Sequence, residues 1–355
     1  MVRIGRRTNM RRRLAAAALA MILAACGSDG AETPGTTAPA QAAAPSSTTP
    51  DPLEPVALVA SLGVERSPIK PAAPVTDLVA GFNNAGFDLW HTQPVTDNAV
   101  FSPASIGHAL LMARAAADDT TGAAIDAAFT LPVGTTAHQA WNAIDQQLRH
   151  TGSDDVTITI ADRIWPRIGL RADQAWIDLL AAEHGADVEA LDLAGDPEGS
   201  RNVINDWVGE QTQQLIPELL SPGSIHPNTL LVLTDAVYFE ARWQTPFGKY
   251  DAQDDTFTTL DGTELPVELM RELELADRRG VGDGFAAAEI PYAGKEYSML
   301  VIVPDHGRYE EIRDRLDQTF LDEIDTTFTT GPYELLLPRW DDAYQLDLLT
   351  WLTNI

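Results

Sequence analysis

Residues 230–243 have the sequence LLVLTDAVYFEARW, and Phe247 follows four positions later. The apolar run has the length of a strand and is almost continuous, whereas a strand with one face in water alternates apolar and polar residues. The segment therefore predicts a central strand whose two faces are both covered by other parts of the protein.

Strands and helices are both indicated on either side of this segment. Residues 156–160 alternate apolar residues with Thr, which is typical of a half-buried strand, and residues 297–303 and 334–338 are apolar runs of strand length. The sequence DGT at 261–263 predicts a hairpin turn. Because the strands are mostly joined by hairpins and do not alternate regularly with helices, we predict an α+β domain. Helical periodicity is found in four segments: residues 78–89, 104–117, 176–185 and 201–215.

The N-terminus has the pattern of an export signal. Residues 1–13 contain six Arg and no acidic residue, and residues 14–25 are twelve apolar residues, which suit a signal-peptide core but are too few to span a bilayer. The sequence LAAC at 23–26 resembles a bacterial lipobox, which implies a lipid on Cys26 and anchoring to the outer face of the cell membrane. An ordinary secretory signal with an unmodified Cys26 stays open. Since Cys26 is the only cysteine, we expect no disulfide.

We divide the chain into a lipoprotein signal peptide (residues 1–25), a disordered tether (26–75) rich in Ala, Pro, Thr and Ser, and one domain (76–355). The whole chain has a net charge of −28. Six of its 24 basic residues lie in residues 1–13, so the remainder carries 18 basic and 52 acidic residues. This excess of negative charge argues against a nucleic-acid partner.

Short motifs follow one another along the domain. The most specific is INDWVGEQTQQLI at 204–216, which has the pattern IN-x-WV-x-x-x-T-x-x-x-I, and ADRIW at 161–165 is close to a strand pattern with Asn after the Ala. In sequence and in order, the motifs resemble those of the serpins, a family of protease inhibitors, and this resemblance over residues 76–355 implies a serpin-like fold. The other matches are NAVFSPASI at 98–106, GAAI at 122–125, LLSPGSI at 219–225, the segment 230–243, EIPY at 289–292, SML at 298–300, VPD at 303–305 and LPRW at 337–340.

The resemblance implies roles for four residues. Ser102 and Ser105 match serines of the shutter, a polar cluster beneath the main sheet, although Ser102 before Pro103 is also a standard helix N-cap. Asp235 stands where serpins usually have Asn, and a buried carboxylate there needs a donor or a proton. Trp243 matches the tryptophan of the breach, near the point where the reactive loop begins to insert, and it also suits a core position at a strand end.

No enzyme chemistry is indicated by the sequence. The segment that starts at Ser102 lacks the Lys of a Ser-x-x-Lys nucleophile, and no nucleophile elbow, phosphate-binding loop or dinucleotide motif is present. The seven histidines include no His-x-x-x-His pair. We therefore expect no catalytic residue, no metal site and no cofactor.

The resemblance implies a monomeric inhibitor of an extracellular serine-type endopeptidase. In the family, the reactive loop lies C-terminal to the helix that residues 344–352 resemble, so we expect the 355-residue chain to lack a reactive-centre bond and to be inactive. A fragment of a longer product and the product of a truncated or decaying gene both fit this expectation. Two other classes stay open: a non-inhibitory serpin-fold surface protein that binds a partner, and an unrelated solute-binding lipoprotein.

Overall fold

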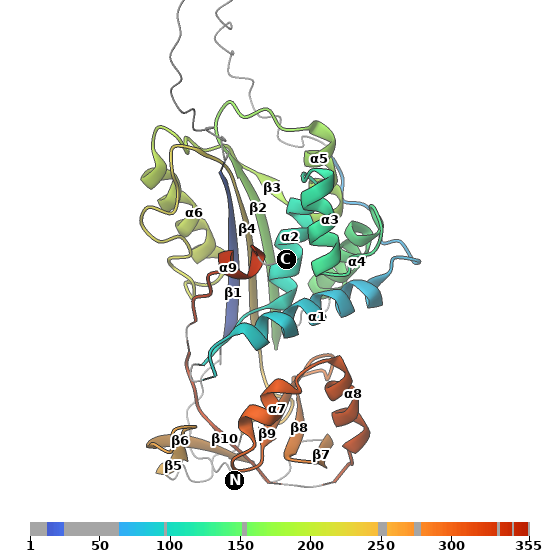
Figure 1. Cartoon of the computed structure of the whole chain (residues 1–355), viewed down its shortest axis with the longest axis vertical. Helices are drawn as coiled ribbons and strands as arrows, with labels where there is room; N and C mark the ends of the chain where they lie inside the picture. The colour runs from blue at the N-terminus through green and yellow to red at the C-terminus, as the bar shows by residue number, and fades with distance from the viewer. Residues whose placement is uncertain are drawn as a thin grey trace, which may run out of the picture.

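The computed structural model describes residues 13–24, 64–95, 98–150, 155–247, 254–272, 278–331, 334–342 and 344–353, the first of these ranges by its backbone alone. A long sheet stands between helices, and a second group of shorter strands lies beyond one end of it (Figure 1). This mixture of helices and largely antiparallel strands confirms the predicted α+β class.

The main sheet contains four strands in the order β1-β4-β2-β3. The central strand β4 (Thr229–Ala241) is antiparallel to β2 (Val156–Pro166), which in turn pairs in parallel with the short β3 (Asp187–Val188). On its other side β4 pairs antiparallel with β1 (Arg13–Ala24). Strand β1 overlaps the signal-peptide core expected at 14–25, and the signal peptide itself stays a prediction.

Strand β4 is covered on both faces, as its sequence predicts. Leu231 and Leu233 pack with Met112 of the helix α2 (Pro103–Arg114), and all three side chains are buried. On the opposite face Val232 packs with Ile204 of α6 (Pro197–Gln211). Because successive side chains of a strand point to opposite faces, both sets of positions in β4 must be apolar.

Two three-stranded sheets form the other group of strands, in the orders β10-β6-β5 and β7-β8-β9. The turn expected at 261–263 joins β5 and β6, which confirms the hairpin. The strand bounds are β5 (Asp254–Thr258), β6 (Glu264–Glu272), β7 (Arg278–Gly282), β8 (Phe285–Pro291), β9 (Ser298–Pro304) and β10 (Leu335–Pro338).

The predicted helices are present, but two of them end early, and the one expected over 104–117 ends at Arg114. The helix expected over 201–215 ends at Gln211, because Gln213 and Gln214 have positive φ angles of 53° and 62°. The side chain of Asn205 then holds the returning chain, since its amide donates to the Leu220 carbonyl and its oxygen accepts from the Leu220 N–H. The other helices are α1 (Val75–Thr92), α3 (Asp119–Ala128), α4 (Thr136–His150), α5 (Gln174–Leu179), the π-helical η1 (Leu180–His184), α7 (Tyr309–Asp314), α8 (Gln318–Thr327) and α9 (Leu349–Leu352).

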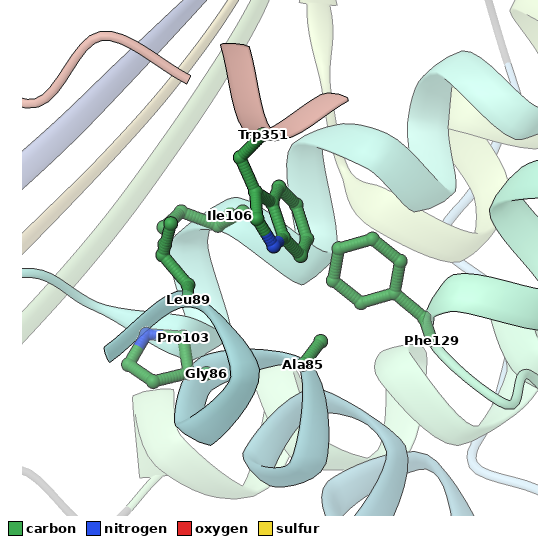
Figure 2. A pocket seen from close by; sticks show the side chains of 7 residues that line it. All are labelled: Ala85, Gly86, Leu89, Pro103, Ile106, Phe129 and Trp351. Carbon is green, nitrogen blue, oxygen red and sulfur yellow. The ribbon is translucent and has the colours of Figure 1, made fainter. Parts of the chain in front are cut away.

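The C-terminal helix α9 packs onto the first helices of the domain. The indole of Trp351 points towards α1 and the Phe129 ring (Figure 2), and the two rings meet edge to face with centroids 5.8 Å apart. Leu89 and Ile106 line the same small pocket. Residues 349–352 thus close the apolar core formed by α1 and α2.

The ordered contacts begin before residue 76, the expected start of the domain. Arg66 donates to Asn142 and Asp145 of α4, and the Ser67 N–H donates to the Ala182 carbonyl. Arg66 and Ser67 lie within the expected tether, so the boundary at residue 76 is too late. Cys26 lies outside the described residues. Within the described part of the chain, no helix has both the length and the apolar character needed to cross a bilayer.

Candidate functional site

The N-terminal end of α2 confirms the structural role of Ser102. Its Oγ accepts a hydrogen bond of 3.1 Å from the Ser105 N–H, and Pro103 occupies the first helical turn. Ser105 is buried, and its Oγ has no partner within the described residues. The two serines therefore lie at the start of the helix beneath β4, and the hydroxyl of Ser105 does not reach Asp235 by a hydrogen bond.

One turn beyond Ser105, His108 brings together two buried aspartates. His108 Nδ1 lies 2.6 Å from Asp235 Oδ2 and 3.3 Å from Asp162 Oδ1, and all three side chains are fully buried. Asp162 and Asp235 are paired residues of β2 and β4, directly opposite each other. An ionised carboxylate only accepts hydrogen bonds, so His108 Nδ1–H donates to Asp235. The donor that a buried Asp235 requires is thus supplied by α2.

The cluster continues through two further histidines. His108 Nε2 lies 2.8 Å from His184 Nδ1, and His184 Nε2 lies 2.8 Å from Nδ1 of His138. The ring of His108 also stacks on Trp141, with centroids 3.8 Å apart. We name the five residues Asp162, Asp235, His108, His184 and His138 the buried cluster; it joins β2, β4, α2, η1 and α4.

Burial and neighbouring charges shift the pKa values of the residues in the buried cluster in different directions. Burial by itself lowers the pKa of His108, but the negative charges of Asp162 and Asp235, together with the hydrogen bond to Asp235, outweigh it and raise the pKa to about 9. Burial raises the pKa of the Asp235 carboxyl to about 7, against the effect of its bond to His108. Burial and then repulsion by His108 lower the pKa of His138 to about 4, and the pKa of His184 is lowered for the same reasons.

These directions fix the orientation of the hydrogen bonds. A doubly protonated His108 donates through Nε2 to His184 Nδ1, and neutral His184 then donates through Nε2 to His138 Nδ1. Both ring nitrogens of His108 and of His184, and Nδ1 of His138, thus have a hydrogen-bond partner. The chain of bonds runs from the middle of the main sheet towards α4.

Trp243 lies apart from the buried cluster, beyond the end of β4. Its ring stacks on Tyr292 with centroids 4.6 Å apart and an angle of 12°, and it meets Phe247 edge to face. Trp243 and Tyr292 also form an isolated antiparallel bridge. Trp243 joins the main sheet to β8, which fits a core residue at a strand end; its breach role stays a prediction.

The spacing of residues along the chain does not reveal the buried cluster. Its three histidines are separated by 30 and 46 positions, so the absence of a His-x-x-x-His pair did not reveal that their rings meet in three dimensions. A signal was nevertheless present. Asp162 and Asp235 each replace an Asn of the pattern that their strand resembles, and each is a buried residue of its strand. Two such aspartates on strands that pair require a positive partner.

Comparisons with known proteins agree on one family. The family model described as "Serpin (serine protease inhibitor)" matches residues 81–355. The chain is 28% identical over 279 residues to an uncharacterised serpin-like protein of Methanosarcina mazei, covering 76% of this chain and 62% of that protein. It is 32% identical over 272 residues to serpin B6 of Pongo abelii, covering 73% of this chain and 70% of that protein.

The fold comparison gives the same result. The structure of emu (Dromaius novaehollandiae) ovalbumin superposes with a TM-score of 0.74 at 22% identity, covering 78% of this chain and 77% of ovalbumin. At this identity the likeness concerns the fold. The chain spans less than two thirds of the length of the archaeal relative.

Proposed function

Because this chain belongs to the serpin family, we propose that it forms the body of an exported, lipid-anchored inhibitor of an extracellular serine-type endopeptidase. The proposed inhibitor acts as a monomer, without a nucleic-acid partner. Its target is a protease held in a covalent complex after cleavage of an exposed loop.

The pairing of β1 with β4 supports this proposal most directly. The register runs from Arg13 opposite Glu240 to Ala24 opposite Thr229, so a strand lies along almost the whole edge of β4. In the family, the cleaved reactive loop is added to the main sheet as an extra strand. Export would remove residues 13–24 with the signal peptide, and the same edge of β4 would then be open to another antiparallel, apolar strand, which is the structural requirement for that step.

Inhibition is tested with the complete gene product that contains these residues. We expect a detergent-stable complex with at least one protease from a panel of trypsin-like, chymotrypsin-like, elastase-like and subtilisin-like enzymes. A polypeptide of residues 26–355 is the matched control, and we expect it to form no complex because the resemblance places the reactive loop outside it. Cleavage of the complete product by every protease, without any complex, would contradict the inhibitor proposal.

The lipid anchor is tested separately at Cys26. We expect the wild-type protein made in a bacterium with a lipoprotein pathway to enter the detergent phase in a phase-separation assay. The Cys26→Ala variant should stay in the aqueous phase, because it has no thiol for the lipid. If the two proteins partitioned equally, the proposed lipid anchor on Cys26 would be contradicted. The proposal of protease inhibition would be unaffected.

The buried cluster favours a second candidate, a serpin-fold surface protein that binds a partner without inhibiting. His108 ties α2 to both β2 and β4, and such charged bonds hold one arrangement of the sheet rather than two of similar energy. This candidate predicts that proteolysis of the complete product leaves its Tm unchanged. A rise in Tm after cleavage would show that a strand has been added to the sheet and would exclude it.

A further inference from the structure

We propose that His108, Asp162 and Asp235 form a binding site for one divalent transition-metal cation, of the Zn²⁺ class, in the centre of the molecule. This inference goes beyond the proposed inhibitor function and stands on different observations. It also reverses the expectation from histidine spacing that the chain has no metal site.

The first observation is the charge of the site. Asp162 and Asp235 face each other on paired strands with no exposure to water, and like charges in this position repel. The neighbouring Arg163 is engaged elsewhere, by Glu189 and Asp187. Arg66, whose charge also acts on Asp162, is bound to Asp145 instead, so among the described residues His108 is the basic side chain that contacts the two carboxylates. A divalent cation bound to both carboxylates and a neutral imidazole would bring the total charge to zero.

The second observation is the free coordinating capacity of the aspartates. Both oxygens of Asp162 and Oδ1 of Asp235 are buried and lack a hydrogen-bond partner within the described part of the chain. One ligand atom from each of the three residues can be chosen so that all lie within 4.8 Å of one another. Ligands that share a Zn²⁺ ion at about 2.0–2.1 Å lie roughly 3.0–3.5 Å apart. The His108–Asp162 distance of 3.3 Å already fits this range.

The distance of 2.6 Å from His108 Nδ1 to Asp235 Oδ2 fits a shared proton. When a metal ion replaces that proton on Nδ1, the two atoms need to separate by less than about 1 Å. The remaining bonds keep their direction, because Nε2–H of His108 still donates to His184 Nδ1. Histidines that bind metals usually donate their second N–H in this way, which fixes the ring and its tautomer.

The surroundings make the site rigid. Its ligands come from one helix and two paired strands, and the His108 ring stacks on Trp141, with centroids 3.8 Å apart, while its edge is hydrogen-bonded to His184 at 2.8 Å. Sites on such elements are positioned more accurately than sites on loops. One imidazole with two carboxylates suits Zn²⁺, Mn²⁺, Fe²⁺ or Co²⁺, whereas Ca²⁺ and Mg²⁺ prefer oxygen ligands alone.

The test is direct metal binding to the full 355-residue chain, made without a histidine tag and stripped of metal by a chelator. We expect one equivalent of Zn²⁺ to be retained after desalting, and Co²⁺ to give visible d–d absorption bands of a bound ion. At a Zn²⁺ concentration about 100 times the Kd, the Tm should rise by about 5 °C or more.

Asp162→Asn and Asp235→Asn keep the shape of each side chain and remove its charge, and each should weaken Zn²⁺ binding at least about tenfold. His184→Gln, which alters the hydrogen bond behind His108, should weaken binding about 10- to 100-fold. The matched control is His226→Gln, at an exposed histidine outside the cluster, which should bind like the wild type.

Three results would overturn the proposal. The first is a wild-type chain that retains no Zn²⁺ and gives neither Co²⁺ bands nor a shift in Tm. The second is Zn²⁺ binding that the two Asp→Asn variants leave unchanged, which would place the ion elsewhere. The third is saturation by Ca²⁺ or Mg²⁺ with no preference for Zn²⁺. The first of these results is measured on the wild-type chain, so it can refute the proposal even if none of the variants folds.

Discussion

The substitution His138→Gln should change how the stability of the metal-free protein depends on pH. Burial of the His138 side chain, followed by repulsion from His108 and Arg114, lowers its pKa to about 4, although Asp126 acts in the opposite direction. In the unfolded chain the pKa is close to 6.5. The folded state therefore binds this proton less readily than the unfolded state, and protonation favours unfolding.

The sign and the size follow from these two pKa values. The contribution of His138 to the unfolding free energy is constant above a pH of about 6.5. It is lost as the pH falls towards 4 and does not return at lower pH. At a pH of about 4.5 the wild type should have lost about 2.5 kcal/mol of unfolding free energy through this group alone. The glutamine side chain of the variant would not titrate. Its imperfect replacement of the hydrogen bond to His184 costs about 1 kcal/mol at any pH.

The variant should thus be less stable than the wild type by about 1 kcal/mol at a pH of about 7.5, and more stable by about 1.5 kcal/mol at a pH of about 4.5. Urea unfolding followed by tryptophan fluorescence, with a chelator present at both pH values, measures the difference. His226→Gln, at an exposed histidine outside the buried cluster, is the control. A difference between wild type and His138→Gln that stays constant with pH would refute the argument from burial.

Three further substitutions test how the elements are joined. Gly107→Ala should destabilise the protein by about 1–3 kcal/mol, because an added Cβ would lie 2.5 Å from the Phe82 ring in a filled core. Asn205→Ala should cost about 1–3 kcal/mol, since it leaves the buried Leu220 N–H without its acceptor, while the Leu220 carbonyl keeps the hydrogen bond from Arg201. Asp196→Ala should cost about 1 kcal/mol through loss of the N-cap of α6. Denaturant unfolding measures all three.

The same helix offers controls for two of these substitutions. Asn202→Ala and Asp206→Ala change exposed side chains of α6 and should alter the unfolding free energy by no more than about 0.5 kcal/mol. If Asn205→Ala lowered the unfolding free energy no more than Asn202→Ala does, the hydrogen bonds of Asn205 would not hold the segment at Leu220 to α6. If Gly107→Ala were neutral, the contact between α2 and Phe82 would be looser than the structure indicates.

The sequence indicated the helices and two strands of the main sheet, β2 and β4, whereas β1 and β3 were not predicted as strands. An apolar run in 230–243 is predicted to be a strand covered on both faces, and β4 lies between α2 and α6 as that pattern requires. The C-terminal ends of two helices, however, were predicted too late in the chain. The helix expected to reach residue 215 stops at Gln211, because Gln213 and Gln214 have positive φ angles, and Asn205 then holds the returning chain at Leu220.

The candidate site was predicted only in part. Ser102 is the helix N-cap that its position before Pro103 indicates, and the need of Asp235 for a donor followed from its charge and expected burial. Which donor would meet that need could not be predicted. His108 lies 127 positions from Asp235, and neither residue has a neighbour in the sequence that points to the other.

The amino-acid sequence by itself determined the family, the class of fold and the acidic character of the chain, because each depends on residue types within short segments. The tertiary structure alone decided the buried cluster. Register between β2 and β4 sets Asp162 beside Asp235, and the packing of α2, η1 and α4 aligns three distant histidines behind them. Contacts between residues far apart in sequence are fixed by the register of strands and the packing of helices, and no local pattern encodes either.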